Sequence, residues 1–178
     1  MRHAIYAGHR PGYHAPDDAP LTDTGRSQTL SAPPLPERID RIVTSPLRRA
    51  RETASLLSAT TGVPLIAESG LLREWSAPSS VLGHTSESRP RSYERWRHER
   101  LHDPDKAYED GESLRHLHER AQAAHAFLQH MNRKSVGDLL VVTHKVLGEV
   151  LTHLEQGPAA FETASVSTWE FTELRRCR

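Results

Sequence analysis

The chain has 178 residues, of which 36% are apolar and 26% charged, and its 23 basic residues balance 23 acidic ones. This length suits roughly one domain of about 150 residues and excludes a second full domain. The balanced charge favours neither a nucleic-acid nor a membrane-surface partner. The longest apolar stretch, Leu139 to Val142, is far shorter than the roughly 20 residues of a membrane span. We therefore expect one globular domain over residues 1–178, with no nucleic-acid or membrane partner.

The cysteine content and the first residues indicate the compartment. The single cysteine, Cys177, excludes an intrachain disulfide framework and a cysteine metal site. Residues 1–11 contain basic and histidine side chains but no apolar run, so they do not resemble a secretory signal. These features predict a cytoplasmic protein, and they leave its oligomeric state open.

Strands and helices alternate in the first half of the chain. The β-branched run from Ile39 to Thr44 predicts a buried strand. Apolar residues spaced three and four apart predict a helix that begins near Pro46 and ends at Gly62. A further short strand is expected from Pro64 to Glu68.

The second half continues this alternation. A three-four apolar repeat from Leu114 to Met131 predicts a long helix, whose start is marked by Ser113. Residues 138–143 are expected to form a buried strand that leads into a helix over residues 145–154. A last strand is predicted from Ser165 to Thr172. The alternation predicts an α/β fold with three layers, α/β/α, around a mostly parallel central sheet.

The segment from Trp75 to Asp110 differs in composition from the rest of the chain. It contains three prolines and, near its middle, five arginines. We expect a cap or insertion at about residues 75–110 that lies over the sheet edge rather than in the core. The arginines either form a basic lid that attracts phosphorylated compounds or lie on a solvated helix, interleaved with Glu94 and Glu99. They are Arg89, Arg91, Arg95, Arg97 and Arg100.

Two strand-to-helix junctions carry cationic or titratable side chains. Arg48, Arg49 and Arg51 follow the first predicted strand, in helical turns where the helix dipole disfavours cations. His144 directly follows the strand over residues 138–143. The carboxyl ends of parallel strands form a ligand crevice in which free helix N–H groups attract anions, so these residues predict a pocket for a phosphoryl group. Taken singly, the arginines also fit a solvent-exposed role, and His144 fits a capping or packing role.

Six segments carry recognisable motifs. They are Arg2-His3-Ala4 and residues 15–25, 44–54, 72–74, 111–114 and 140–144. In this order they resemble the histidine phosphatase superfamily, which has a phosphoglycerate mutase-like fold. Residues 44–54, which include Ser-Pro-Leu-Arg-Arg-Ala, are the most specific match, and the six segments together span most of the chain.

The resemblance implies a metal-independent phosphatase without a cofactor. His3 would be the nucleophile, and His144 would be the second catalytic imidazole. Arg2, Arg49 and His144 would bind the phosphoryl group, and Glu74 would donate a proton to the leaving group. Two guanidinium groups and imidazole N–H donors are sufficient to stabilise the charge of a phosphoryl group in transfer.

The expected reaction is hydrolysis of a small phosphorylated metabolite through a phosphohistidine intermediate. Glu74 would be protonated when substrate binds and would then activate the water that resolves the intermediate. Alternatively, Glu74 is a loop carboxylate paired with Arg73. In that case Glu68 and Glu87 are the nearest candidates in the sequence for the acid. Two further functions stay open: a non-catalytic module that binds a phosphorylated ligand, and a protein phosphohistidine phosphatase.

Two positions differ from the pattern of the family. Only one residue precedes the Arg-His signature, so we expect the central strand found there in the family to be missing or replaced. A second register, with residues 4–7 as that strand and His9 as the nucleophile, stays open beside the favoured His3. Lys145 stands where the family usually has glycine and adds a cation next to the pocket.

Overall fold

The computed structural model describes residues 1–10, 14–85, 87–133 and 136–177. Within these residues the helices are α1 (Asp23–Leu30), α2 (Arg48–Thr61), α3 (Arg91–Glu99), α4 (Leu114–Asn132), α5 (Lys145–Thr152) and α6 (Ala160–Val166), and the strands are β1 (Ile39–Thr44), β2 (Leu65–Glu68) and β3 (Asp138–Val142). Short 3-10 turns are η1 (Gly70–Leu72), η2 (Ser79–Val81) and η3 (Leu154–Ala159). No helix in the described parts of the chain has the length and apolar character needed to cross a membrane.

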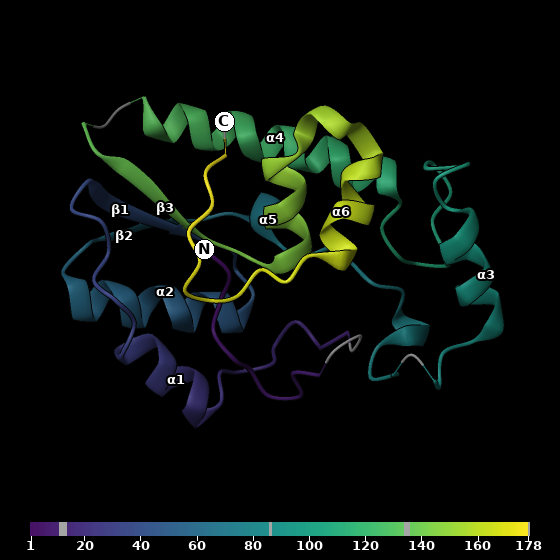
Figure 1. The fold of residues 1–178 in the computed structure, drawn as a ribbon, viewed down its shortest axis with the longest axis horizontal. Helices are drawn as coiled ribbons and strands as arrows, with labels where there is room; N and C mark the ends of the chain where they lie inside the picture. The colour runs from purple at the N-terminus through teal and green to yellow at the C-terminus, as the bar shows by residue number, and fades with distance from the viewer. Residues whose placement is uncertain (11–13, 86, 134–135, 178) are drawn as a thin grey trace.

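The elements form three layers, as the alternation predicts (Figure 1). The central sheet is parallel and has the strand order β2-β1-β3. Helices α1 and α2 lie on one face of the sheet, and α4, α5 and α6 lie on the other. The predicted α/β/α architecture with a mostly parallel sheet is therefore confirmed.

Both faces of the sheet are buried because successive side chains of each strand point to opposite sides. Ile42 of β1 packs in the cluster that contains Leu57 of α2, whereas the neighbouring Val43 packs in the larger cluster with Leu117 of α4 and Leu147 of α5. The sheet thus separates two hydrophobic cores, which is typical of parallel sheets covered on both faces.

The predicted helix boundaries follow local sequence signals. Helix α2 ends at Gly62, which adopts φ 75°, a left-handed conformation that glycine accepts without a steric cost. Helix α4 begins after Ser113, whose side chain accepts a hydrogen bond from the backbone N–H of His116. These two ends confirm the predicted boundaries.

The first residues pair with the end of β3. Residues 1–3 run parallel to the end of β3, where Thr143 donates its backbone N–H to Met1 and His3 donates its own to Thr143, both at 3.0 Å. The chain then leaves the sheet, and Tyr6 forms an isolated antiparallel bridge with Leu21. A short stretch of pairing therefore lies at this edge of the sheet, where the sequence predicts a missing or replaced strand.

The predicted strand from Ser165 to Thr172 is wrong. Its first residues belong to α6, and residues 167–170 form no strand. The Trp169 side chain is almost completely buried and packs over Gly148, where a Cβ atom would lie only 2.1 Å from the indole ring. A tertiary contact with α5 therefore overrides the apolar alternation that predicts a strand.

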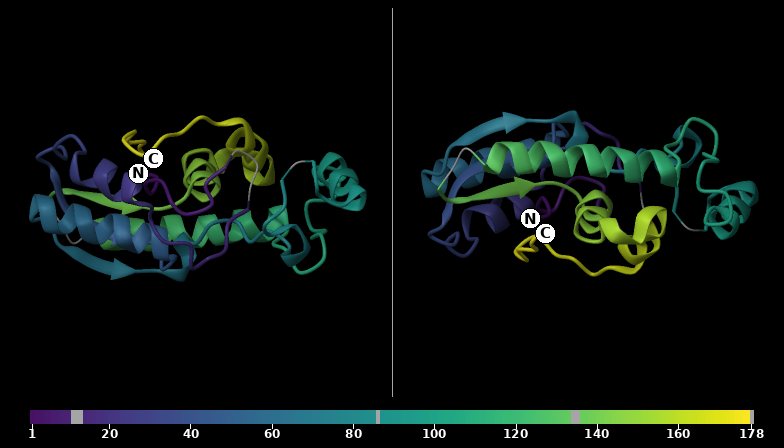
Figure 2. Two further views of the ribbon diagram at one scale, coloured as in Figure 1. Left: turned by 90° about the horizontal axis from the view of Figure 1, so that it is seen from below. Right: turned by 90° about the horizontal axis from the view of Figure 1, so that it is seen from above.

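The segment over residues 75–110 contains η2 and α3 and lies at one end of the molecule, beyond the end of α4 (Figure 2). Val81, Tyr93 and Trp96 are buried in the larger hydrophobic core. Trp96 stacks on Trp75 with ring centroids 6.4 Å apart. The expectation that the segment lies outside the core is wrong in this respect.

Candidate active site

The end of β3 brings His3 and His144 together. His144 directly follows the last paired residue, Thr143, and precedes α5, while His3 is hydrogen-bonded through its backbone N–H to that same Thr143. The two imidazole rings lie with centroids 5.0 Å apart at an angle of 58°. Both side chains are buried, with 5% of His3 and none of His144 exposed.

Hydrogen bonds determine which nitrogen atoms of these rings are available. The Nδ1 atom of His3 lies 2.8 Å from the carbonyl oxygen of Ala4. A carbonyl oxygen only accepts, so Nδ1 holds the proton and Nε2 presents its lone pair. The Nε2 atom of His144 lies 2.8 Å from the Ser45 hydroxyl, which also accepts the backbone N–H of Leu47. When the hydroxyl donates its O–H to Nε2 of His144, the proton of that neutral ring lies on Nδ1.

Burial keeps both imidazoles neutral. Burial, followed by the positive charge of Arg49, lowers the pKa of His3 well below its usual value, although its bond to Ala4 opposes the shift. Burial also lowers the pKa of His144 well below its usual value, with smaller contributions from His3 and Arg49. A neutral His3 is the form that can attack an electrophile.

This burial predicts a pH-dependent stability. In the unfolded chain both histidines bind protons below about pH 6.5, whereas in the native protein they do not, so the free energy of unfolding must fall as pH decreases below about 6.5. The limiting slope is about 1.4 kcal/mol per pH unit for each histidine. Urea unfolding of wild type and His144→Gln between pH 7.5 and 5.0 measures it.

The matched control is His98→Gln, because His98 is exposed on α3. We expect His144→Gln to lose part of the acid dependence and His98→Gln to retain it. An unchanged slope in His144→Gln would contradict the buried, neutral state of this ring.

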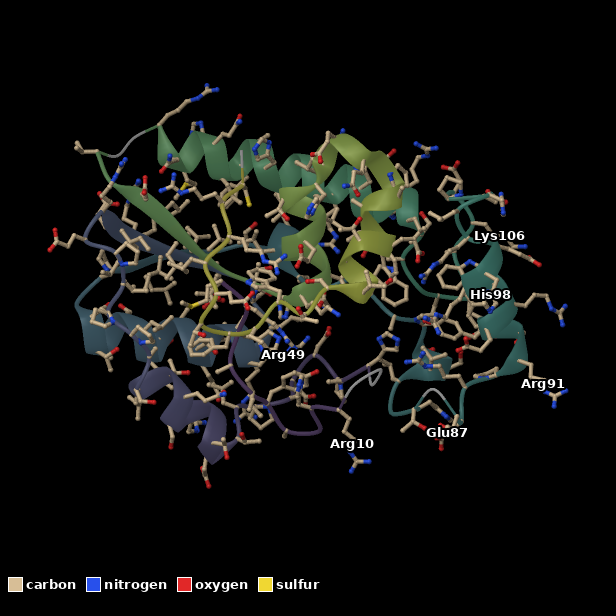
Figure 3. All side chains as sticks on the ribbon, viewed as in Figure 1. Arg10, Arg49, Glu87, Arg91, His98 and Lys106 are labelled. Carbon is tan, nitrogen blue, oxygen red and sulfur yellow. The ribbon has the colours of Figure 1, made fainter. Side chains whose placement is uncertain are left out.

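Arg49 is the buried arginine of the first junction. Only 4% of Arg49 is exposed, its guanidinium donates to the carbonyl of Pro16 at 3.1 Å, and it lies 5.0 Å from the centroid of the Tyr6 ring. Figure 3 shows Arg49 in the interior, away from the side chains labelled on α3 and its flanks. The neighbouring Arg48 is exposed and bonds Glu52 at 2.8 Å. Adjacent helical residues point about 100° apart, so only Arg49 turns inward.

Arg2 is the second arginine close to His3. Its Nη1 donates to the carbonyl of Trp169 at 3.0 Å, and its side chain is 15% exposed and 4.0 Å from the Glu170 carboxylate. A cavity of about 230 Å³ opens beside Arg2 and His3 and is also lined by His9. His9 itself is exposed, with its ring 5.1 Å from that of Tyr6.

The Glu74 side chain contacts the first turn of α5. Its carboxylate accepts backbone N–H groups of Trp75, Val146 and Leu147 at 3.0 to 3.2 Å. Burial of Arg49 is the main cause of its lowered pKa, and the negative charge of Glu74 opposes this shift. Arg73 pairs with Asp17 instead of Glu74. Glu74 therefore lies at the second strand-to-helix junction, the one that contains His144.

The other candidate acids lie elsewhere. Glu68 is exposed at the end of β2 and pairs with Arg51 at 3.3 Å. Glu87 is exposed and, in Figure 3, lies well away from Arg49. Neither carboxylate reaches the junction after β3 as Glu74 does.

Lys145 and most of the arginines in residues 89–100 contact other residues of the protein. The Lys145 ammonium donates to the carbonyl of Ser165 at 3.2 Å. Arg100 is buried over the ring of Phe161 and pairs with Glu162 at 2.6 Å. Two of the five arginines, Arg91 and Arg95, are exposed, and Arg97 pairs with Glu94 at 3.0 Å. The interpretation as a solvated helix therefore applies to only some of the five arginines.

Sequence reasoning missed three residues that support the site. Ser45 opens the Ser-Pro-Leu-Arg-Arg-Ala motif but was given no role of its own, yet it bonds His144. Arg120 and Glu112 form a half-buried ion pair that binds the backbone next to Glu74. The partners of Arg120 include backbone carbonyls, which leave no side-chain signal in the sequence. The available signals were Ser45 and Glu112, each of which belongs to one of the recognised motifs.

The layered fold of this α/β protein brings two imidazoles, His3 and His144, and two guanidinium groups, Arg2 and Arg49, close to the carboxyl ends of the strands. The family model of the histidine phosphatase superfamily (branch 1) matches residues 1–176. The chain therefore belongs to this superfamily, as its motifs predict. A search of curated proteins finds no match.

Several solved structures are similar to this chain. The product of open reading frame Rv3214 from Mycobacterium tuberculosis is 27% identical with a TM-score of 0.62, over 91% of this chain and 81% of that one. A mycobacterial glucosyl-3-phosphoglycerate phosphatase in complex with inorganic phosphate is 25% identical with a TM-score of 0.61, over 92% and 75%. The alpha-ribazole phosphatase from Shigella flexneri is 18% identical with a TM-score of 0.66, over 91% and 82%, which shows the shared fold.

Proposed function

We propose that the protein hydrolyses phosphomonoesters of a small metabolite through a phosphohistidine on His3. The main support is a set of three buried donor atoms, Nε of Arg2, Nε of Arg49 and Nδ1 of His144, that have no hydrogen-bond partner among the described residues. A buried donor without a partner costs about 1–3 kcal/mol, and more when it is charged. The charges of Arg49 and Arg2 both lower the pKa of His3, and the His144 ring lies 5.0 Å from the His3 ring, so these three donors lie near one nucleophile. This arrangement favours a site that binds an anion.

The proposed first step is attack of His3 Nε2 on the phosphorus atom. The new N–P bond forms as the ester P–O bond breaks, and the leaving alkoxide takes a proton from Glu74, which enters this step in its protonated form. Arg2, Arg49 and His144 donate hydrogen bonds to the phosphoryl oxygens as their charge is redistributed. The alcohol is then released.

The proposed second step regenerates the enzyme. Glu74, now a carboxylate, takes a proton from water, and the resulting oxygen nucleophile attacks the phosphohistidine. The N–P bond breaks, its electron pair returns to His3 Nε2, and inorganic phosphate leaves. Similarity at 25% identity to a phosphatase that binds inorganic phosphate supports a small phosphorylated substrate.

The proposal is tested with p-nitrophenyl phosphate as a generic substrate and with a panel of phosphorylated metabolites. Hydrolysis with release of inorganic phosphate is expected. Binding of phosphate without turnover of any ester would instead favour the non-catalytic module. Turnover of a phosphohistidine-containing protein alone would favour a protein phosphohistidine phosphatase.

We expect the activity to be independent of metal ions. Arg2, Arg49 and the two histidines supply the positive charge and the donors that a divalent ion would otherwise provide. Within the described residues, no group of three or more His, Cys, Asp or Glu side chains has an arrangement suitable for a metal. Assays after dialysis against EDTA should give the rate of untreated enzyme. Loss of activity that a divalent ion restores would contradict the mechanism.

A further inference from the structure

Arg120 on α4 uses all of its donors on one short segment and its partner. Its Nη1 donates to the carbonyls of Leu71 and Arg73 at 3.0 and 2.8 Å, and its Nη2 donates to the carbonyl of Glu74 at 3.3 Å. Its Nε and Nη2 also donate to the two carboxylate oxygens of Glu112 at 2.7 and 2.8 Å. A guanidinium has five N–H groups, and here five acceptors surround it.

Glu112 binds the same segment from a second direction. Its carboxylate accepts the backbone N–H of Ser76 at 3.2 Å, and its backbone N–H donates to the carbonyl of Ser76 at 2.9 Å. Its own carbonyl accepts the indole N–H of Trp75 at 2.8 Å. Only 9% of the Glu112 side chain and 17% of that of Arg120 are exposed. Such a satisfied, mostly buried ionic network fixes backbone geometry strongly.

The backbone that this pair binds carries Glu74. On the opposite side, the Glu74 carboxylate bonds Val146 and Leu147 in the first turn of α5. Residues 71–76 therefore connect the Arg120–Glu112 pair on α4 to the helix that follows His144. The hydrogen bonds of Arg120 reach the backbone of Glu74 and not its carboxylate, so these bonds act on that group through the backbone.

We propose that Arg120, held by Glu112, is a positioning residue that places Glu74 for proton transfer to the leaving group. This inference rests on the proposed function, because it assigns Arg120 to one step of that reaction. Loss of the guanidinium fork releases three carbonyl groups of residues 71–74, so the Glu74 carboxylate loses its fixed position relative to the substrate. Phosphate binding by Arg2 and Arg49 does not depend on these bonds.

The chemistry of the leaving group separates this role from a merely structural one. An alkyl leaving group is a strong base and needs the proton, whereas p-nitrophenolate is a weak base and leaves without it. The value of kcat/KM reports the steps up to the first irreversible one, here phosphorylation of His3. A defect in acid positioning should therefore reduce kcat/KM for an alkyl phosphate far more than for p-nitrophenyl phosphate.

The experiment compares Arg120→Lys, Glu112→Gln and Glu74→Gln on β-glycerophosphate and p-nitrophenyl phosphate. Arg120→Lys keeps the positive charge but lacks the planar fork. We expect it to lower kcat/KM by about 10²-fold for the alkyl ester and by less than about fivefold for the aryl ester. The double variant Glu74→Gln/Arg120→Lys should be no slower on the alkyl ester than Glu74→Gln alone.

The matched control is Arg115→Lys, because Arg115 lies on the same helix, is exposed and pairs with Asp105 at 2.8 Å. It should change both rates by less than about twofold. Equal losses on both esters in Arg120→Lys would mean a structural role, and no loss on either would mean no role. Each result would overturn the proposal, and Glu112→Gln provides the same comparison if Arg120→Lys does not fold.

Amide hydrogen exchange tests the positioning without any turnover. The backbone N–H groups of Trp75, Val146 and Leu147 bond the Glu74 carboxylate, so Arg120→Lys should accelerate their exchange while Arg115→Lys does not. Unchanged exchange would refute the positioning role. Wild-type protein that hydrolyses neither ester would refute the proposed function, and the exchange result would still decide whether Arg120 positions Glu74.

Discussion

Replacing His3 with alanine is expected to lower kcat/KM for p-nitrophenyl phosphate by at least about 10⁴-fold, because the covalent intermediate cannot form. The Nδ1 atom of His3 is committed to the carbonyl of Ala4, so Nε2 is the attacking atom. Rapid mixing, an alkaline quench that preserves the N–P bond, and mass spectrometry of peptides should locate the phosphoryl group on His3.

His9→Ala is the matched control for this experiment. His9 is exposed and lies beside the cavity near His3, so its removal should reduce the rate by no more than about threefold. Recovery of the phosphoryl group on His9 would establish the other register of the N-terminal motif. Recovery on His144 would exchange the roles of the two imidazoles.

Arg49→Ala is expected to lower kcat/KM by about 10³-fold, because it removes a guanidinium that stabilises the charge of the transferring phosphoryl group. Its burial, its unpartnered Nε and its position over Tyr6 make it the arginine of α2 that turns toward the pocket. Inhibition by inorganic phosphate should weaken in the same variant, which separates loss of anion binding from loss of the nucleophile.

Arg48→Ala tests the same helix one residue earlier. The Arg48 side chain is 55% exposed, and its bond to Glu52 is an exposed i,i+4 ion pair of the kind that contributes little to stability. We expect a change of less than about threefold in kcat/KM. Mild and equal effects of Arg48→Ala and Arg49→Ala would place both arginines on the solvated surface, which is the alternative that the sequence left open.

The parts of the fold that depend on local periodicity could be predicted from the sequence. Strand β1 has the predicted bounds, and α2 and α4 end or begin at the residues whose capping chemistry predicts it, Gly62 and Ser113. The resemblance also predicted that side chains from distant segments lie close together. His3, Arg49, Glu74 and His144 come from four separate segments, and only the sheet topology brings these segments to one edge.

The parts that depend on distant contacts could not be predicted in this way. Apolar residues around Trp169 have the spacing of a strand, but the indole ring packs on the bare backbone at Gly148, and this contact has no local signature. The role of Arg120 was invisible for the same reason, because three of its partners are main-chain carbonyls. Every residue has a main-chain carbonyl group, so the residue type at a position does not show that its carbonyl binds Arg120.

The bond between Arg2 and the Trp169 carbonyl links the pocket to the last part of the chain. The Nε atom of Arg2 is still available to an anion while Nη1 holds that carbonyl, so the two interactions do not compete for one donor. Linked equilibria are reciprocal: if ordering of residues 167–175 strengthens anion binding at Arg2, the bound anion must stabilise the order of these residues by the same free energy. With Arg2 as a phosphoryl ligand, occupancy of the pocket and local unfolding of the C-terminal segment are thermodynamically coupled.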